Sequence, residues 1–205
     1  MSSNELIRKA EELANRMQRN DRCILTPKTK LQHIQMVVDM VKGLNIKGDE
    51  IIIVAYLHDI LDYVEEPSKQ SLIEEIRLTF GSHILKLVEE VSDNFKMEDV
   101  SLSEKQFKDR MTVITSPGGI SDTAAIIILA EKVCNLTDMY EEIKKRSDNE
   151  YWNDLYQKNG LKKVDVHNYY FTIFENIAKR CETNYHLRGL INRYDDFIYR
   201  IFEEN

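Results

Sequence analysis

Proline and glycine are scarce in this sequence, with three prolines and seven glycines among 205 residues. Both residues interrupt regular structure, so their scarcity favours long helices. Apolar residues recur at helical spacing, and no convincing pair of strands is visible. The sequence therefore predicts an all-α protein built as a single helical bundle. Helices are expected over residues 4–19, 29–44, 49–65, 68–80, 84–91, 104–114, 123–145, 163–181 and 185–202, with a short element that includes a turn over 149–160 and connections over 20–30, 93–103 and 116–119.

Cysteine is also sparse, and its pattern does not suggest pairing. Cys23, Cys134 and Cys181 are odd in number and widely spaced, which predicts a reduced, cytoplasmic protein rather than a disulfide framework. The first residues are polar, so no signal peptide is visible. No apolar run reaches the roughly 18 to 20 residues that span a bilayer, and we expect no membrane partner.

An excess of positive charge is missing as well. The chain carries 28 Lys and Arg against 35 Asp and Glu, a formal net charge of -7. This balance argues against general nucleic-acid binding, which usually needs a basic face. An anionic small molecule is still possible, because a local basic rim or a metal ion can attract one. The length favours one domain with one core.

The chain does contain an apolar run that ends in ionisable residues. Residues 51–57 are uncharged and mostly aliphatic, and they lead directly into His58 and Asp59, with Asp62 three residues on. Four β-branched residues make a strand the alternative over 51–57, but apolar character continues beyond it, which is too long for an ordinary strand. We therefore expect a buried helix from an N-cap at Asp49 to about residue 65.

An isolated ionised carboxylate in a protein interior costs many kcal/mol, so these groups need compensation. On a helix, His58, Asp59 and Asp62 share roughly one side. Imidazole and carboxylate together suit a divalent ion such as Mn²⁺, Fe²⁺ or Zn²⁺. The alternative is an imidazole–carboxylate pair that satisfies itself in the core.

A second apolar run has the same character. Residues 124–130 are apolar and end at Glu131, and Glu131, Asn135 and Asp138 form one polar stripe at i, i+4 and i+7 of the expected helix. The alternative is that this stripe faces solvent. His33, on a third helix, supplies another imidazole.

These residues, in this order and spacing, resemble a known family. Residues 55–59 (AYLHD), 80–81 (FG), 87–93 (LVEEVSD) and 129–136 (LAEKVCNL) are similar to the family's ALLHD, FG, LVEEVTD and LADKLYNL. The likeness runs from about residue 16 to 178. The sequence resembles the HD-domain phosphohydrolases. More narrowly, it resembles the (p)ppGpp hydrolase domain of RelA/SpoT homologues in the compact form of the small alarmone hydrolases.

The resemblance implies an all-helical HD domain over residues 1–184 that binds one divalent metal, typically Mn²⁺. By position, its metal ligands would be His33, His58, Asp59 and Glu131. The family has Asp where this chain has Glu131, a difference of one methylene. Residues 185–205 fall outside the likeness and are expected to form a helix that packs on the domain.

The resemblance also implies substrate contacts. Asn135 matches a nucleotide-contacting Asn, Tyr170 a Tyr near the base and ribose, and Arg22 a basic residue near the N-terminus, while Lys132 is expected to hold phosphate. Arg16 lies at a family Lys. Lys28 and Lys30 are further candidates for holding phosphates.

Two departures from the family concern catalysis. The family's water-activating Glu-Asp pair is Asp62-Tyr63 here, so Asp62 is expected to orient or deprotonate water, with Glu65 or Glu66 as a substitute for the missing carboxylate. The basic pairs near the N-terminus are reduced to Arg16-Met17 and Arg22-Cys23.

Three functions follow from this resemblance. The first is hydrolysis of the 3′-pyrophosphate of a guanosine alarmone. The second is an HD phosphohydrolase with another substrate, such as a different nucleotide or a 2′-phosphorylated cofactor. The third is a catalytically weak nucleotide-binding regulatory module. All three imply a small nucleotide as partner, and none predicts the oligomeric state.

Overall fold

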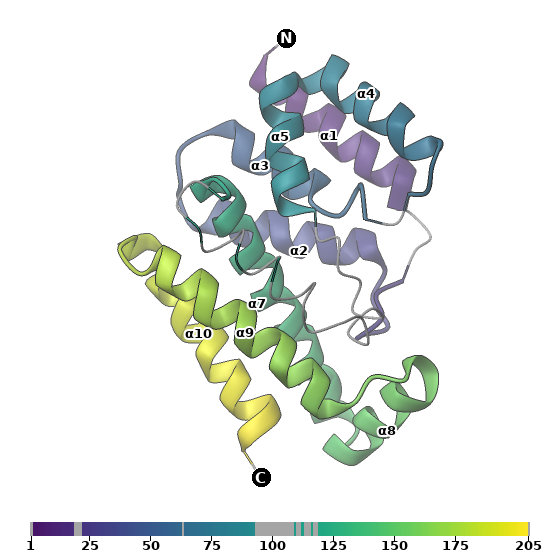
Figure 1. Ribbon diagram of the computed structural model, residues 1–205, viewed down its shortest axis with the longest axis vertical. Coiled ribbons are helices and arrows are strands. Elements are labelled where there is room, and N and C mark those ends of the chain that lie inside the picture. The colour runs from purple at the N-terminus through teal and green to yellow at the C-terminus, as the bar shows by residue number, and fades with distance from the viewer. Residues whose placement is uncertain are drawn as a thin grey trace.

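The computed structural model describes residues 2–18, 22–62, 64–92, 109, 112, 116 and 119–204. Over these residues the protein is all-α, which confirms the predicted fold class, and the one pairing of strand type is an isolated bridge between Arg22 and Thr29. The helices are α1 (Ser3–Gln18), α2 (Lys30–Gly43), α3 (Asp49–Leu57), α4 (Ser68–Phe80), α5 (Ser82–Val91), α7 (Asp122–Lys145), α8 (Asp148–Asn159), α9 (Lys163–Cys181), η2 (Tyr185–Leu187), α10 (Arg188–Ile198) and η3 (Tyr199–Glu203) (Figure 1).

The long helix α7 is the centre of the bundle. It contacts α2, α3 and α5 in the N-terminal half and α8, α9 and α10 in the C-terminal half (Figure 1). Residues 124–130 are buried all the way round the helix, as expected for an apolar segment enclosed by neighbours on every side. Among the polar residues that follow, Lys132 and Asp138 are buried and Glu131 and Asn135 are partly buried.

Helix α3 is shorter than predicted. It ends at Leu57 rather than near residue 65, and His58 is its C-cap residue. Beyond it the chain makes turns with i to i+3 hydrogen bonds, from the Ile60 amide to the Leu57 carbonyl at 3.1 Å and from the Asp62 amide to the Asp59 carbonyl at 3.2 Å. The prediction that His58, Asp59 and Asp62 share one helix side was therefore wrong.

The turn after α3 explains the error. Ile60 and Leu61 are both buried, so the apolar character continues because a turn dips into the core, not because the helix continues. The N-terminal prediction was also one residue off. The N-cap is Gly48, with a φ of 121° that a side chain rarely adopts, and Asp49 is the first helical residue.

Other boundaries agree closely with the sequence. Helices α4 and α9 have the predicted bounds, and α7 begins where the Ser121 hydroxyl accepts a hydrogen bond from the Ala124 amide. The expected C-terminal helix over 185–202 is divided into η2, α10 and a π-helical turn, η3, and α10 packs on α7 and α9. The connection predicted over 93–103 lies outside the described residues, and so does the helix over 104–114 apart from two isolated positions.

Among the described residues, no helix combines the length and the apolar character that crossing a bilayer requires.

Candidate metal centre and neighbouring pocket

His33 is presented by the first turn of α2. A capping box starts this helix: the Thr29 hydroxyl accepts from the Gln32 amide at 3.2 Å, and the Gln32 side chain accepts from the Thr29 amide at 2.9 Å. The His33 amide donates to the Thr29 carbonyl at 3.1 Å. The helix start is thus defined one turn before His33, and the imidazole is buried.

His58 stands at the end of α3, where the backbone orients its ring. Its Nδ1–H donates to the Ala55 carbonyl at 2.7 Å, which leaves Nε2 with a lone pair. This Nε2 is buried and has no hydrogen-bond partner among the described residues, with Asp59 Oδ1 3.4 Å away. A backbone carbonyl that orients the second ring nitrogen is typical of metal-binding histidines.

His33, His58 and Asp59 form a compact group. Each offers one ligand atom, and these atoms all lie within 4.8 Å of one another, with the imidazole rings edge to face at a centroid distance of 5.6 Å. His33 Nδ1 is also buried without a hydrogen-bond partner in the described part of the chain. Unsatisfied buried nitrogens are rare in proteins, so two of them beside a carboxylate fit a divalent metal ion.

The charge states of this group suit the same role. Burial lowers the pKa of His33 to about 3, so the imidazole is neutral at physiological pH. Burial raises the pKa of Asp59, but the neighbouring imidazoles and Lys30 outweigh it and leave the pKa below its ordinary value. A neutral imidazole and an ionised carboxylate are the forms that bind metal.

Glu131 lies next to this group but outside it. Its carboxylate accepts hydrogen bonds from Lys132 Nζ, at 3.0 Å and 2.9 Å to its two oxygens, and from Asn135 Nδ2 at 2.7 Å. Burial raises its pKa, which Lys132 opposes, and the negative charge of Asp59 raises it further. The side chain is therefore within electrostatic range of the metal ligands, and its role as a fourth ligand remains a prediction.

Lys132 is hydrogen-bonded to Tyr169, a residue not identified from the sequence. Lys132 is buried, and its ammonium donates to the Tyr169 hydroxyl at 3.0 Å while lying 5.3 Å from the centre of the Tyr169 ring. The predicted substrate contact, Tyr170, is fully buried, and its carbonyl accepts from the Tyr194 hydroxyl at 2.9 Å. Adjacent tyrosines differ by about 100° around a helix, and only the tertiary contact distinguishes them.

The candidate catalytic carboxylates lie further along the chain. The Ser92 hydroxyl donates to Asp62 Oδ1, which connects the turn after α3 to the end of α5. Ser92 belongs to the 87–93 motif, but its contact with Asp62 is tertiary and is not given by the motif. Glu65 is exposed, and Tyr63 lies outside the described residues. Neither Asp62 nor Glu65 belongs to the three-residue group, and their catalytic roles remain predictions.

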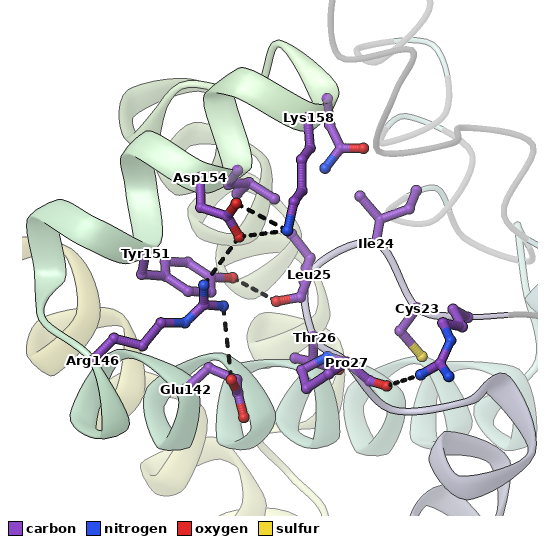
Figure 2. A pocket seen from close by; sticks show the side chains of 13 residues that line it. Cys23, Ile24, Leu25, Thr26, Pro27, Glu142, Arg146, Tyr151, Asp154 and Lys158 are labelled. Atoms are coloured by element: carbon purple, nitrogen blue, oxygen red, sulfur yellow. Dashed lines mark hydrogen bonds and ion pairs between the residues drawn. The ribbon is translucent and has the colours of Figure 1, made fainter.

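A cavity of about 560 Å³ lies between the loop before α2, the end of α7 and α8 (Figure 2). Arg22 is part of its wall, and the Arg22 guanidinium donates to the Pro27 carbonyl at 2.8 Å. Cys23 is part of the same wall. Burial raises the pKa of Cys23 to about 12, and the negative charge of Asp59 raises it as well, so the wall is within electrostatic range of the metal ligands.

Ion pairs line the far side of the cavity. Arg146 lies 3.7 Å from Glu142 and 3.0 Å from Asp154, and Lys158 lies 2.9 Å from Asp154 (Figure 2). With Arg22, three cationic side chains face two carboxylates here, a local positive excess in a protein of negative net charge.

The other basic candidates are engaged elsewhere. Arg16 forms an exposed ion pair with Glu75 at 2.6 Å, and Lys28 pairs with the buried Asp138. Lys30 is buried and close enough to Asp59 to lower its pKa.

Comparisons with known proteins identify the fold and the family of this chain. A solved structure, described as a metazoan orthologue of SpoT that hydrolyses ppGpp and plays a role in starvation responses, superposes with a TM-score of 0.62 at 20% sequence identity, over 95% of this chain and 94% of that one. None of the curated proteins matches the sequence. The sequence profile of the HD domain matches residues 10–181, most of the chain, and includes all three residues of the metal-ligand group. The chain belongs to the HD-domain family.

Proposed function

We propose that this protein is a metal-dependent pyrophosphohydrolase that removes the 3′-pyrophosphate of a guanosine alarmone such as ppGpp. The observation that carries the proposal is the buried group of His33, His58 and Asp59, with two imidazole nitrogens that have no hydrogen-bond partner among the described residues. The fold shared with a ppGpp hydrolase supports the choice of substrate.

His33, His58 and Asp59 would hold the metal ion, with Glu131 as the proposed fourth ligand. Mn²⁺ is the ion we propose, and Fe²⁺ or Zn²⁺ are compatible with the same donors. A divalent ion at such a site lowers the pKa of bound water and neutralises phosphate charge. Glu131 would have to divide its carboxylate between the metal ion and the donors Lys132 and Asn135.

The reaction needs a base and a proton donor. The water oxygen bonds to the phosphorus attached to the ribose 3′-oxygen, and the bond from this phosphorus to the 3′-oxygen breaks. The proton that the water gives up is balanced by the proton that the 3′-oxygen takes up to become a hydroxyl. Asp62 is the proposed acceptor of the water proton, and the Ser92 hydroxyl orients its carboxylate. Glu65 is the proposed second carboxylate from the exposed segment that follows.

The cavity beside the metal ligands suits the nucleoside part of the substrate. Its volume is within the usual range for small-molecule sites. Arg22 lies in its wall. Lys132 and Asn135 lie on α7 and donate hydrogen bonds to Glu131 of the same helix. These three are the proposed phosphate and nucleotide contacts, and Tyr170 is retained as a proposed contact near the base.

The experiment is incubation of purified protein and Mn²⁺ with ppGpp and a panel of other nucleotides, including 2′-phosphorylated ones, with separation of the products. Release of GDP and pyrophosphate from ppGpp, abolished by Asp59→Ala, is the expected result. Turnover restricted to another nucleotide would contradict the alarmone assignment and favour an HD phosphohydrolase of different specificity. Binding of ppGpp without turnover would favour a regulatory module.

A further inference from the structure

One wall of the cavity is a short segment without helix, residues 22–29, which leads directly into α2 and His33. The segment closes on itself: the Cys23 amide donates to the Lys28 carbonyl at 2.9 Å, and Arg22 and Thr29 form the isolated bridge. Residues 22–27 all line the cavity. The position of this wall therefore determines the width of the cavity and where Arg22 lies.

Two side chains fasten the wall to neighbouring helices. From α7, buried Asp138 accepts a hydrogen bond from Lys28. From α8, the Tyr151 hydroxyl donates to the Leu25 carbonyl at 2.8 Å, a contact drawn as a dashed line in Figure 2. Of these two contacts, the one from Tyr151 is made directly to the backbone of a residue that lines the cavity.

Tyr151 is itself held firmly. Its side chain is 1% exposed, the Arg146 guanidinium lies 5.4 Å from its ring centre, and Arg146 is paired with Asp154 of the same helix α8. Burial raises the pKa of Tyr151, so its hydroxyl remains a hydrogen donor. The donor is thus fixed in place, and the loop backbone is positioned against it.

We propose that Tyr151 is a positioning residue for the substrate: it holds residues 22–27 at the spacing that binds the nucleoside, without touching the reacting atoms. The part of this inference that concerns substrate affinity rests on the proposed function. Loss of the hydroxyl should leave the Leu25 carbonyl without its donor and let the wall move, which weakens substrate binding more than it slows the chemical step.

The test is Tyr151→Phe, with Tyr194→Phe as the matched control. Tyr194 is also fully buried and also donates its hydroxyl to a backbone carbonyl, that of Tyr170, but it does not line the cavity. Both variants lose one buried hydroxyl-to-carbonyl hydrogen bond and keep the aromatic ring. Hydrogen–deuterium exchange of residues 22–29 and the free energy of unfolding are measured for the wild type and both variants. Steady-state kinetics with ppGpp are measured for the wild type and Tyr151→Phe only, because Tyr194 bonds to Tyr170, a proposed substrate contact.

We expect Tyr151→Phe to raise KM about fivefold to tenfold with little change in kcat, since one lost hydrogen bond corresponds to roughly that factor. Amide exchange in residues 22–29 should accelerate in Tyr151→Phe and stay at the wild-type rate in Tyr194→Phe.

Three results would contradict the inference. Unchanged exchange in residues 22–29 of Tyr151→Phe would show that the hydroxyl does not hold the wall. Equally accelerated exchange in both variants would show a general loss of stability. Faster exchange with an unchanged KM would show that the wall does not set substrate affinity. A wild type that leaves ppGpp intact would instead contradict the proposed function, and the exchange rates would still decide whether Tyr151 positions the wall.

Discussion

The two ring nitrogens of His58 have different surroundings, and this difference is the chemical basis of the site. Nδ1–H donates a hydrogen bond to the Ala55 carbonyl, so the backbone of α3 sets the tautomer. Nε2 is directed to the space shared with His33 and Asp59. Three groups from two segments of the chain thus present metal-binding atoms to one shared space.

Replacement of Asp59 tests the ligand group directly. We expect Asp59→Ala to weaken Mn²⁺ binding more than about 100-fold, because loss of residues that only support a ligand already costs 10- to 100-fold. Isothermal titration of metal-free protein with Mn²⁺ measures this. Asp195→Ala, an exposed carboxylate on α10, is the control and should bind Mn²⁺ like the wild type. Similar affinities in all three proteins would exclude Asp59 as a ligand.

Because the pKa of His33 is lowered by burial, we expect the free energy of unfolding to depend on pH. Its pKa is about 3 in the folded protein against about 6.5 when unfolded, so between these values the unfolded chain binds a proton that the folded protein does not. The free energy of unfolding of metal-free protein should therefore fall as pH decreases from about 6.5 towards 3, by up to about 1.4 kcal/mol per pH unit from this residue. Above pH 6.5 this contribution is constant.

Urea unfolding in EDTA at several pH values checks the prediction, with His33→Gln as the comparison. The variant lacks the titrating imidazole and should show a shallower loss of stability with acid. Parallel curves for wild type and variant would mean that His33 is not buried as a neutral imidazole.

At the scale of elements, the caps of the helices determine where the ligands lie. Thr29 and Gln32 start α2 one turn before His33, and α3 ends at Leu57, so His58 and Asp59 lie where the helix passes into a turn.

The cap of α2 can be weakened alone. We expect Thr29→Ala to lower the free energy of unfolding by about 1 kcal/mol and to weaken Mn²⁺ binding a few-fold, because the turn that carries His33 becomes less ordered. Ser147→Ala removes a similar cap from α8, where the Ser147 hydroxyl accepts from the Glu150 amide at 3.3 Å. It should reduce stability by a similar amount and leave Mn²⁺ affinity unchanged. A metal effect in both variants would reflect stability alone.

Helix positions were largely predictable from sequence, but not every helix end. The bounds of α4 and α9 agree with the ranges 68–80 and 163–181 predicted from the sequence. The end of α3 did not, because buried Ile60 and Leu61 in a turn have the same apolar signature as a continuing helix. The division of the C-terminal segment at Ile198 likewise has no proline or glycine to indicate it.

The site could be predicted only in part, for a related reason. His33, His58 and Asp59 were identifiable from motif order, and the structure brings them together. The pairing of Glu131 with Lys132 and the role of Tyr169 as a partner of Lys132 depend on tertiary contacts between α7 and α9, which no local pattern encodes.

At the scale of the whole molecule, α7 contributes to both the proposed metal site and the cavity. Its middle contributes Glu131 and Asn135 beside the metal ligands, and its end contributes Glu142 to the cavity. The chain is acidic overall, yet Arg22, Arg146 and Lys158 gather around the cavity. A divalent ion would add further positive charge beside them, so an anionic nucleotide can be bound by a protein of negative net charge.

The most direct test is titration of metal-free protein with Mn²⁺ while pyrophosphate release from ppGpp is followed. The proposed function predicts no turnover in EDTA, turnover that rises with bound Mn²⁺ and saturates at one equivalent, and no turnover in Asp59→Ala at any Mn²⁺ concentration that the wild type needs. Full turnover in EDTA, or none in the wild type with Mn²⁺ bound, would contradict it.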